Sequence, residues 1–170
     1  MQSAINEQIN LEMFSANTYL SMSTYFAQQG LDGFAHWYYM QYKEELAHAE
    51  DMMHYVITRG GKVEIKAVAA VETEFNSPLE IAEKAYHHEC LVSEKIEGLV
   101  RIASEEKDMP SQDFFWKYIR EQVEEEANAT NIIERLRLAE GHAILFLDKE
   151  LQLHFVMHRG RVVRGEEYWA

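Results

Sequence analysis

Apolar residues recur along most of the chain at alternating intervals of three and four, which is the spacing of an amphipathic helix. Glycines and only two prolines interrupt this pattern, so the sequence predicts four long helices followed by a shorter fifth. Ser77 can cap the third helix, Pro78 suits its first turn and Glu80 completes a capping box. The predicted helices span residues about 3–29, 34–60, 78–106, 111–138 and 143–154.

The connections between these helices determine the topology. Short connections after the first and third helices predict antiparallel hairpins, whereas about seventeen residues separate the second helix from the third. A segment of that length reaches about 55 Å when extended, which exceeds the length of about 40 Å expected for the second helix. The second and third helices can therefore run parallel. The sequence predicts an all-α four-helix bundle with one long crossover and a short fifth C-terminal helix.

Length and composition narrow the class of protein. The 170 residues suit a single domain over 1–170, with the bundle over about 3–138, the fifth helix over about 143–154 and a basic tail over 155–170. A formal net charge of −13 argues against a nucleic-acid partner, and suits either a cation-handling surface or plain solubility. Cys90 is the single cysteine, so no internal disulfide can form, and no signal segment or membrane-length apolar run occurs. We therefore expect a cytoplasmic protein with no membrane role.

The core-facing stripe of each long helix is interrupted by an acid near its middle. Burying one ionised carboxylate without a partner is costly, and gathering four of them adds like-charge repulsion. The candidate lysines and arginines lie on other helix faces, which leaves His48 as the only potential cation in the four stripes. The sequence therefore predicts that a multivalent metal ion neutralises the four acids, which are Glu12, Glu45, Glu89 and Glu125.

The types of ligand indicate which metal is bound. Glu45 and His48 are three residues apart and project from the same helix face. Carboxylate oxygens with one imidazole suit iron or manganese better than a structural zinc site, and a bridging glutamate allows two ions. Di-iron bundles use one Glu from each of two helices and Glu-x-x-His from each of the others. The fourth helix here offers Gln122 and Glu125 at that spacing instead of a second Glu-x-x-His.

Several segments, in order along the chain, resemble the ferroxidase motifs of ferritins. They are residues 10–12, 43–50, 86–89 and 121–126, and residues 59–62 and 148–151 also match the family. The chain thus resembles a bacterial-type non-haem ferritin over roughly residues 4–153, which implies the ferritin-like bundle. Leu46 stands where bacterioferritins place the methionine that binds haem, so no haem is expected.

The resemblance implies a role for each matching residue. Glu12 and His48 are expected to bind the first iron, Glu45 to bridge, and Glu89 and Glu125 to bind the second. Gln122 is expected to line the oxygen side, and Tyr19 to supply an electron or a hydrogen bond. The extra acids Glu44, Glu121 and Glu124 match a third iron site. The implied function is an iron-storage ferroxidase subunit that oxidises Fe(II) with O2 or hydrogen peroxide and stores Fe(III) mineral in a cage of 24 identical subunits.

Two alternatives remain open from the sequence. A rubrerythrin-like di-iron peroxidase or oxidase uses a similar bundle, but the chain has neither a second Glu-x-x-His nor a Cys-x-x-Cys electron-transfer module. A structural cage subunit is expected to have lost the acids in the stripes, which this chain retains. We expect His87 and His88 to lie at the surface and Cys90 to contribute packing only.

Overall fold

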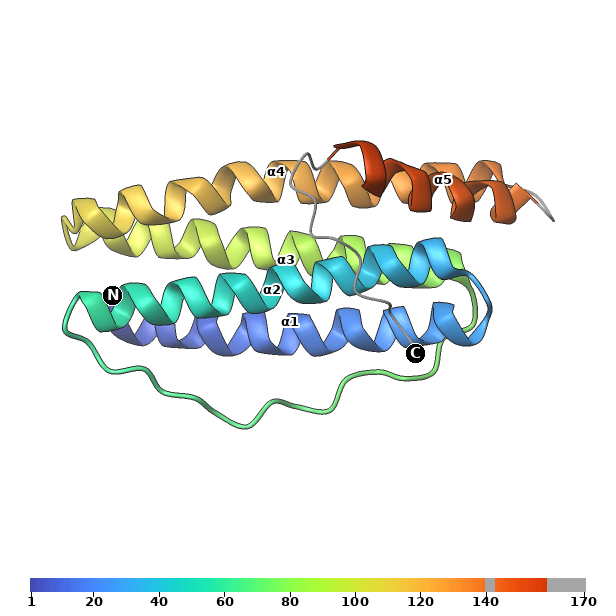
Figure 1. Cartoon of the computed structure of the whole chain (residues 1–170). Coiled ribbons are helices and arrows are strands. Elements are labelled where there is room, and N and C mark those ends of the chain that lie inside the picture. Colours follow the sequence, from blue (N-terminus) through green and yellow to red (C-terminus); the bar gives the residue numbers. More distant parts are fainter. Residues whose placement is uncertain (140–142, 159–170) are drawn as a thin grey trace.

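The computed structural model describes residues 1–139 and 143–158, with side chains described up to residue 152 in the last helix. Within these residues the structure is all-helical, as predicted: α1 (Gln2–Gln28), α2 (Asp32–Thr58), α3 (Pro78–Glu105), α4 (Met109–Leu138) and α5 (Ala143–His158) (Figure 1). The fifth helix extends to His158, beyond the end predicted near residue 154. The side chains of the predicted basic tail, 155–170, lie outside the described residues.

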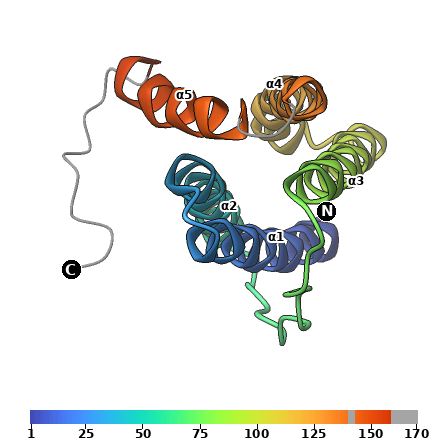
Figure 2. The same cartoon turned by 90° about the vertical axis from the view of Figure 1, so that its right-hand side faces the viewer.

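The helices form two antiparallel hairpins that face each other, α1 with α2 and α3 with α4 (Figure 1). The long crossover carries the chain from the end of α2 back to the start of α3, so α2 and α3 run parallel, as its length predicted. Helix α5 leaves the end of α4 and packs mainly on α2 (Figure 2). None of the described helices combines the length and the apolar character needed to cross a membrane.

The core consists of two apolar clusters, one toward each end of the bundle. In one cluster the ring of Phe26 stacks on Phe34 and on Tyr38, with centroids 4.9 and 5.2 Å apart. In the other, Ile9, Met52 and their neighbours are fully enclosed. On each helix the acid of the stripe lies between the segments that build the two clusters. The apolar ends therefore hold the bundle together around a polar middle.

Two asparagines of α1 hold the long crossover against the bundle. The amide of Asn6 donates to the carbonyl of Lys62 (2.9 Å) and accepts from the backbone N–H of Glu64 (2.7 Å). One turn later, Asn10 donates to the carbonyl of Glu64 (2.8 Å) and accepts from the N–H of Lys66 (2.7 Å). The two amide side chains thus form hydrogen bonds with backbone N–H and C=O groups of the extended crossover, as a neighbouring strand does in a β-sheet. The crossover is therefore fixed along α1 rather than free.

Helix α5 is attached to the first turn of α2 through a polar contact. The buried carboxylate of Asp148 accepts a hydrogen bond from the backbone N–H of Phe34 (2.9 Å), at a helix end where negative charge is stabilised. Gly33 permits this approach, because a Cβ at that position would lie 1.9 Å from the carbonyl oxygen of Asp148. The sequence pattern indicated only a helix break at this glycine.

Candidate metal centre

Three of the four predicted acids are fully buried in the middle of the bundle. Glu12 on α1 is 1% exposed, Glu45 on α2 is 4% exposed and Glu89 on α3 is 2% exposed. Glu125 on α4 is half-buried, and its Oε2 accepts a hydrogen bond from the amide of Gln41 (2.8 Å). The four helices therefore do converge on one belt of carboxylates, and the α4 side of that belt is the most open.

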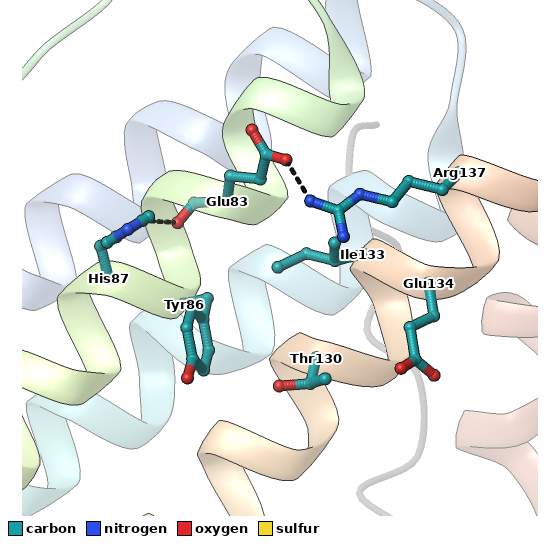
Figure 3. Close-up of a pocket in the computed structure, with 7 residues that line it drawn as sticks. All are labelled: Glu83, Tyr86, His87, Thr130, Ile133, Glu134 and Arg137. Atoms are coloured by element: carbon teal, nitrogen blue, oxygen red, sulfur yellow. Dashed lines mark hydrogen bonds and ion pairs between the residues drawn. The ribbon is translucent and has the colours of Figure 1, made fainter.

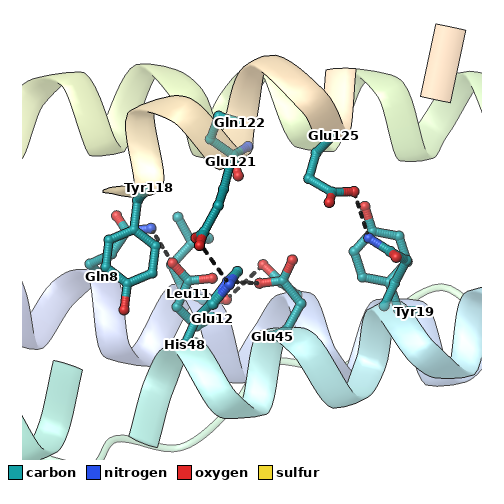
Figure 4. Close-up of polar contacts among 12 residues, drawn as sticks. Gln8, Leu11, Glu12, Tyr19, Glu45, His48, Tyr118, Glu121, Gln122 and Glu125 are labelled. Atoms are coloured by element: carbon teal, nitrogen blue, oxygen red, sulfur yellow. Dashed lines mark hydrogen bonds and ion pairs between the residues drawn. The ribbon is translucent and has the colours of Figure 1, made fainter. Parts of the chain in front are cut away.

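Glu12, Glu45 and His48 form a group that can hold a metal ion. One ligand atom from each lies within 4.8 Å of the other two (Figure 4). Oε2 of Glu12 and Oε2 of Glu45 are buried and have no hydrogen-bond partner among the described residues. Buried acceptors without partners are costly, and a cation offers them the missing interaction. Two carboxylate oxygens and one imidazole fit a divalent transition metal such as iron.

Amide side chains orient the carboxylates. The amide of Gln8 donates to Oε1 of Glu12 (2.7 Å), and the amide of Gln122 donates to Oε2 of Glu89 (2.9 Å). Gln41 does the same for the acid on α4. An amide fixes the orientation of a carboxylate without adding a positive charge that competes with a metal ion. Gln122 was predicted to line the site, whereas Gln8 was missed, although it lies one helical turn before Glu12 on the same face.

Tyr19 lies beside this belt, where it was predicted. Its hydroxyl donates a short hydrogen bond to Oε1 of Glu89. Burial raises the pKa of Tyr19 well above its usual range, and the neighbouring charge of Glu89 raises it further. Burial also raises the pKa of Glu89, although the hydrogen bonds from Tyr19 and Gln122 lower it. The phenol therefore stays protonated and acts as a donor to the carboxylate.

The acids predicted for a third iron site are not gathered into a ready-made group. Oε2 of Glu121 is buried 3.6 Å from Nε2 of His48, whereas the side chain as a whole is 44% exposed. Glu124 is exposed and Glu44 is half-buried. Within the described residues, only Glu12, Glu45 and His48 bring three such ligand atoms this close. The third site stays a prediction, with Glu121 its member nearest to the centre.

The two histidines before Glu89 differ from each other. His87 is exposed, as predicted, and its Nδ1 lies 2.6 Å from the carbonyl of Glu83. The prediction for His88 is wrong: the ring is half-buried, with Nε2 2.7 Å from the hydroxyl of Ser15. Burial lowers the pKa of His88. The error arises because α3 packs beside α1, which covers a face that looked solvated in the sequence.

An open hollow of about 290 Å³ lies between α3 and α4, and none of the belt acids lines it (Figure 3). Tyr86 and Ile133 contribute to its walls. At its rim, the guanidinium of Arg137 pairs with Oε1 of Glu83 (2.8 Å), so these charges satisfy each other. His87 is occupied by a backbone carbonyl. The metal-binding chemistry is therefore concentrated at the belt and not in this hollow.

The metal-free protein is expected to be stabilised by removing the charge of Glu45. Burial raises the pKa of Glu45 well above the ordinary value of 4.5, and the charges of Glu12, Glu89 and Glu125 raise it further. A carboxyl group whose pKa is raised in the folded state stabilises the fold at pH values below its ordinary pKa. This contribution is lost as the pH rises through the folded-state pKa. Glu45→Gln carries no charge, so it should stabilise the metal-free protein at neutral pH by about 1 to 3 kcal/mol.

This difference is measured by thermal unfolding with a chelator present, over a range of pH. The gain over the wild-type protein should shrink as the pH falls toward about 4, where the wild-type carboxyl is itself protonated. A variant that is less stable than the wild-type protein at neutral pH would show that Glu45 does not carry repulsive charge in the metal-free state.

The protein is a four-helix bundle with one long crossover, and a belt of carboxylates with one histidine lies at its centre. These features are those of the ferritin-like class of metal-binding proteins. Comparison with known proteins agrees, since the ferritin family, described as a ferritin-like domain, matches residues 2–139. The chain belongs to the ferritin family and is an iron-storage ferritin subunit.

Individual relatives support the same family. A bacterial non-heme ferritin of Bacteroides fragilis is 47% identical over 151 residues, covering 89% of this chain and 95% of the relative. A bacterial non-heme ferritin of Escherichia coli is 34% identical, covering 86% and 90%. Among solved structures, an open pore ferritin of Archaeoglobus fulgidus superposes with a TM-score of 0.87 at 48% identity, covering 90% of this chain and 96% of that one.

Proposed function

We propose that this subunit oxidises Fe(II) at an intrasubunit di-iron ferroxidase centre, with O2 or hydrogen peroxide as the oxidant. The observation that carries this proposal is the group formed by Glu12, Glu45 and His48, in which two buried carboxylate oxygens have no hydrogen-bond partner among the described residues. An acceptor pair of this kind, enclosed between apolar clusters, is suited to a cation and to little else.

We assign the roles of the residues from the ferritin motifs, and their positions support the assignment. Glu12 and His48 bind the first ion, and Glu89 and Glu125 bind the second. Glu45 bridges, since the charges of Glu12, Glu89 and Glu125 all act on its carboxyl group. When ionised, four carboxylates balance the charge of two Fe(II) ions. Because their negative charge attracts a higher positive charge more strongly, they favour the Fe(III) product. The geometry and the charge come from the protein, and the redox chemistry comes from iron as the substrate.

Residues around the ligands complete the centre. Gln122 holds Glu89 in place and lines the side where oxygen reacts, and Tyr19 donates to the same carboxylate or supplies an electron. Glu121, with Glu44 and Glu124, forms a third iron site. Glu121 supports this assignment because its side chain connects the surface to His48, with one oxygen buried and the rest exposed.

We further propose that identical subunits, 24 in number, assemble in the cytoplasm into a cage that stores the Fe(III) mineral, without haem. Large apolar side chains near the junction of α4 and α5 support assembly. Leu138 is 84% exposed, Phe146 75% and Leu145 51%, which is unfavourable for a surface left in water. Burial against neighbouring subunits removes this cost.

Metal stoichiometry tests the two-ion assignment. In an anaerobic titration with Co(II), which does not oxidise under these conditions, Glu89→Gln should bind one ion fewer per subunit than the wild-type protein. The glutamine keeps the shape of the side chain but removes the charge that the second ion needs. The matched control is Glu134→Gln, an exposed acid on α4, which should keep the wild-type stoichiometry. Unchanged binding by Glu89→Gln would contradict the second iron position.

A further inference from the structure

Among the described residues, none forms a close hydrogen bond with either ring nitrogen of His48. Its Nδ1 lies 4.0 Å from Oε2 of Glu45, and its Nε2 lies 3.6 Å from Oε2 of Glu121. Both distances exceed the range of a normal hydrogen bond. A histidine that binds metal is usually oriented by a hydrogen bond from its other ring nitrogen. Another part of the structure must therefore fix this ring.

The aromatic ring of Tyr118 provides that contact. It packs against His48 with ring centroids 5.1 Å apart and an interplanar angle of 89°, an edge-to-face arrangement (Figure 4). Tyr118 is on α4, one helical turn before Glu121, and is 2% exposed. The ring therefore forms a wall that limits how far the imidazole can turn on the α4 side.

Tyr118 is itself anchored to α2. Its hydroxyl donates to Oδ2 of Asp51 (2.9 Å), and the ammonium of Lys117 forms an ion pair with the same carboxylate. The ammonium also lies 4.5 Å from the centroid of the Tyr118 ring, a cation–π contact. Asp51 follows His48 by three residues, so both project from the same face of α2. The contacts of Asp51, Lys117 and Tyr118 thus join α2 to α4 beside the histidine.

We propose that Tyr118, Asp51 and Lys117 form a brace that positions His48 for the first iron ion. The inference rests on the proposed ferroxidase function and extends it to residues outside the ligand set. Oε2 of Glu45 lies nearest Nδ1 of the imidazole and Oε2 of Glu121 lies nearest Nε2, so the two carboxylates approach different ring nitrogens. The brace keeps the ring where it can share an ion with Glu45 and Glu12. Tyr118 is a positioning residue, since it acts through His48.

The test compares two tyrosine variants. Tyr118→Phe keeps the ring but loses the bond to Asp51. The control is Tyr55→Phe, a half-buried tyrosine whose hydroxyl meets Ser111 and whose ring stacks on Phe114. Anaerobic Co(II) titration, followed by visible absorption, reports both the affinity and the geometry of the first site. Tyr118→Phe should weaken binding of the first Co(II) by about tenfold and change its spectrum, and Tyr55→Phe should do neither.

Kinetics and a second variant separate positioning from general stability. Tyr118→Phe should raise the KM for Fe(II) oxidation and leave kcat nearly unchanged, because saturating iron restores the ligand geometry. Asp51→Ala removes the acceptor of the Tyr118 hydroxyl and the ion pair with Lys117, so it should reproduce the effect. The double variant should be no worse than either single one if the contacts act as a unit. Should Tyr118→Phe not assemble, Asp51→Ala alone decides.

Two outcomes would overturn different claims. If Glu45→Ala weakens Co(II) binding relative to the wild-type protein, but Tyr118→Phe and Asp51→Ala show wild-type affinity and spectrum, the brace is wrong and the centre stands. If Glu45→Ala binds Co(II) as tightly as the wild-type protein does, the proposed centre is itself wrong.

Discussion

Replacing Glu45 with alanine is expected to slow aerobic Fe(II) oxidation by a factor of about 100 or more. Mutating a residue that only hydrogen-bonds to a metal ligand already lowers metal affinity or activity by about 10- to 100-fold, and Glu45 is itself a proposed ligand. Glu45 lies between Glu12 and His48 on one side and the charges of Glu89 and Glu125 on the other. In the proposed centre, its loss removes a ligand from both ions. The rate is measured by the appearance of ferric absorbance after Fe(II) is mixed with oxygenated buffer.

The control makes the same chemical change on the same helix. Glu50 is an exposed acid of α2, so Glu50→Ala removes one negative charge from the surface without touching the belt. It should oxidise iron at the wild-type rate. Equal rates for Glu45→Ala and Glu50→Ala would mean that oxidation does not depend on the assigned centre.

The second large effect is expected at the junction of α2 and α5. A Cβ added by Gly33→Ala would lie 1.9 Å from the carbonyl oxygen and 2.9 Å from Oδ1 of Asp148. No real contact is that short, so α5 must leave its position and lose the hydrogen bond from Phe34 to Asp148. Overpacking of this kind typically costs about 1 to 3 kcal/mol and sometimes more. Limited proteolysis should cut within or before α5, and thermal unfolding should begin earlier.

Gly98 offers a matched control, because it is also a helical glycine and a Cβ there meets nothing within 4 Å. Gly98→Ala should stabilise α3 by about 0.5 to 1 kcal/mol, since alanine loses less backbone entropy on folding. If Gly33→Ala resists protease and heat as well as the wild-type protein does, α5 is not fixed by the contact with α2.

Much of the fold could be predicted from local patterns. Helix spacing, the capping box at Ser77 and the length of the crossover each specify a feature within a single segment, and the parallel arrangement of α2 and α3 follows from them. The acids of the site could also be recognised in the sequence. A charged residue in an apolar stripe is unfavourable for folding, so its presence there indicates a functional role. Glu12, Glu45 and Glu89 were predicted to be buried for this reason, and they are.

Features that depend on the register between helices could not be predicted. Gln41 and Glu125 come from different helices, and nothing in either segment indicates that an amide on α2 meets a carboxylate on α4. The same holds for Tyr118 and Asp51. His88 was misplaced for the same reason, since its burial depends on where Ser15 of α1 lies. Periodicity indicates which face of a helix is buried, but not what the neighbouring helix presents to it.

The arrangement places stability and chemistry in separate parts of the bundle. Apolar clusters at both ends enclose a middle that contains several acids, and the pKa values of Glu45 and Glu89 are raised by that burial. In the metal-free state the acids oppose folding, and the ends must supply the compensating stability. Binding of cations removes the repulsion, so iron and the fold are expected to stabilise each other.

The location of iron itself is the most direct test of the central claim. Crystals soaked in Fe(II) without oxygen, with diffraction recorded on both sides of the iron absorption edge, give anomalous difference peaks that mark the ions. The proposed centre predicts one peak among Glu12, Glu45 and His48 and a second beside Glu89 and Glu125. Peaks confined to surface acids, with none inside the bundle, would contradict it.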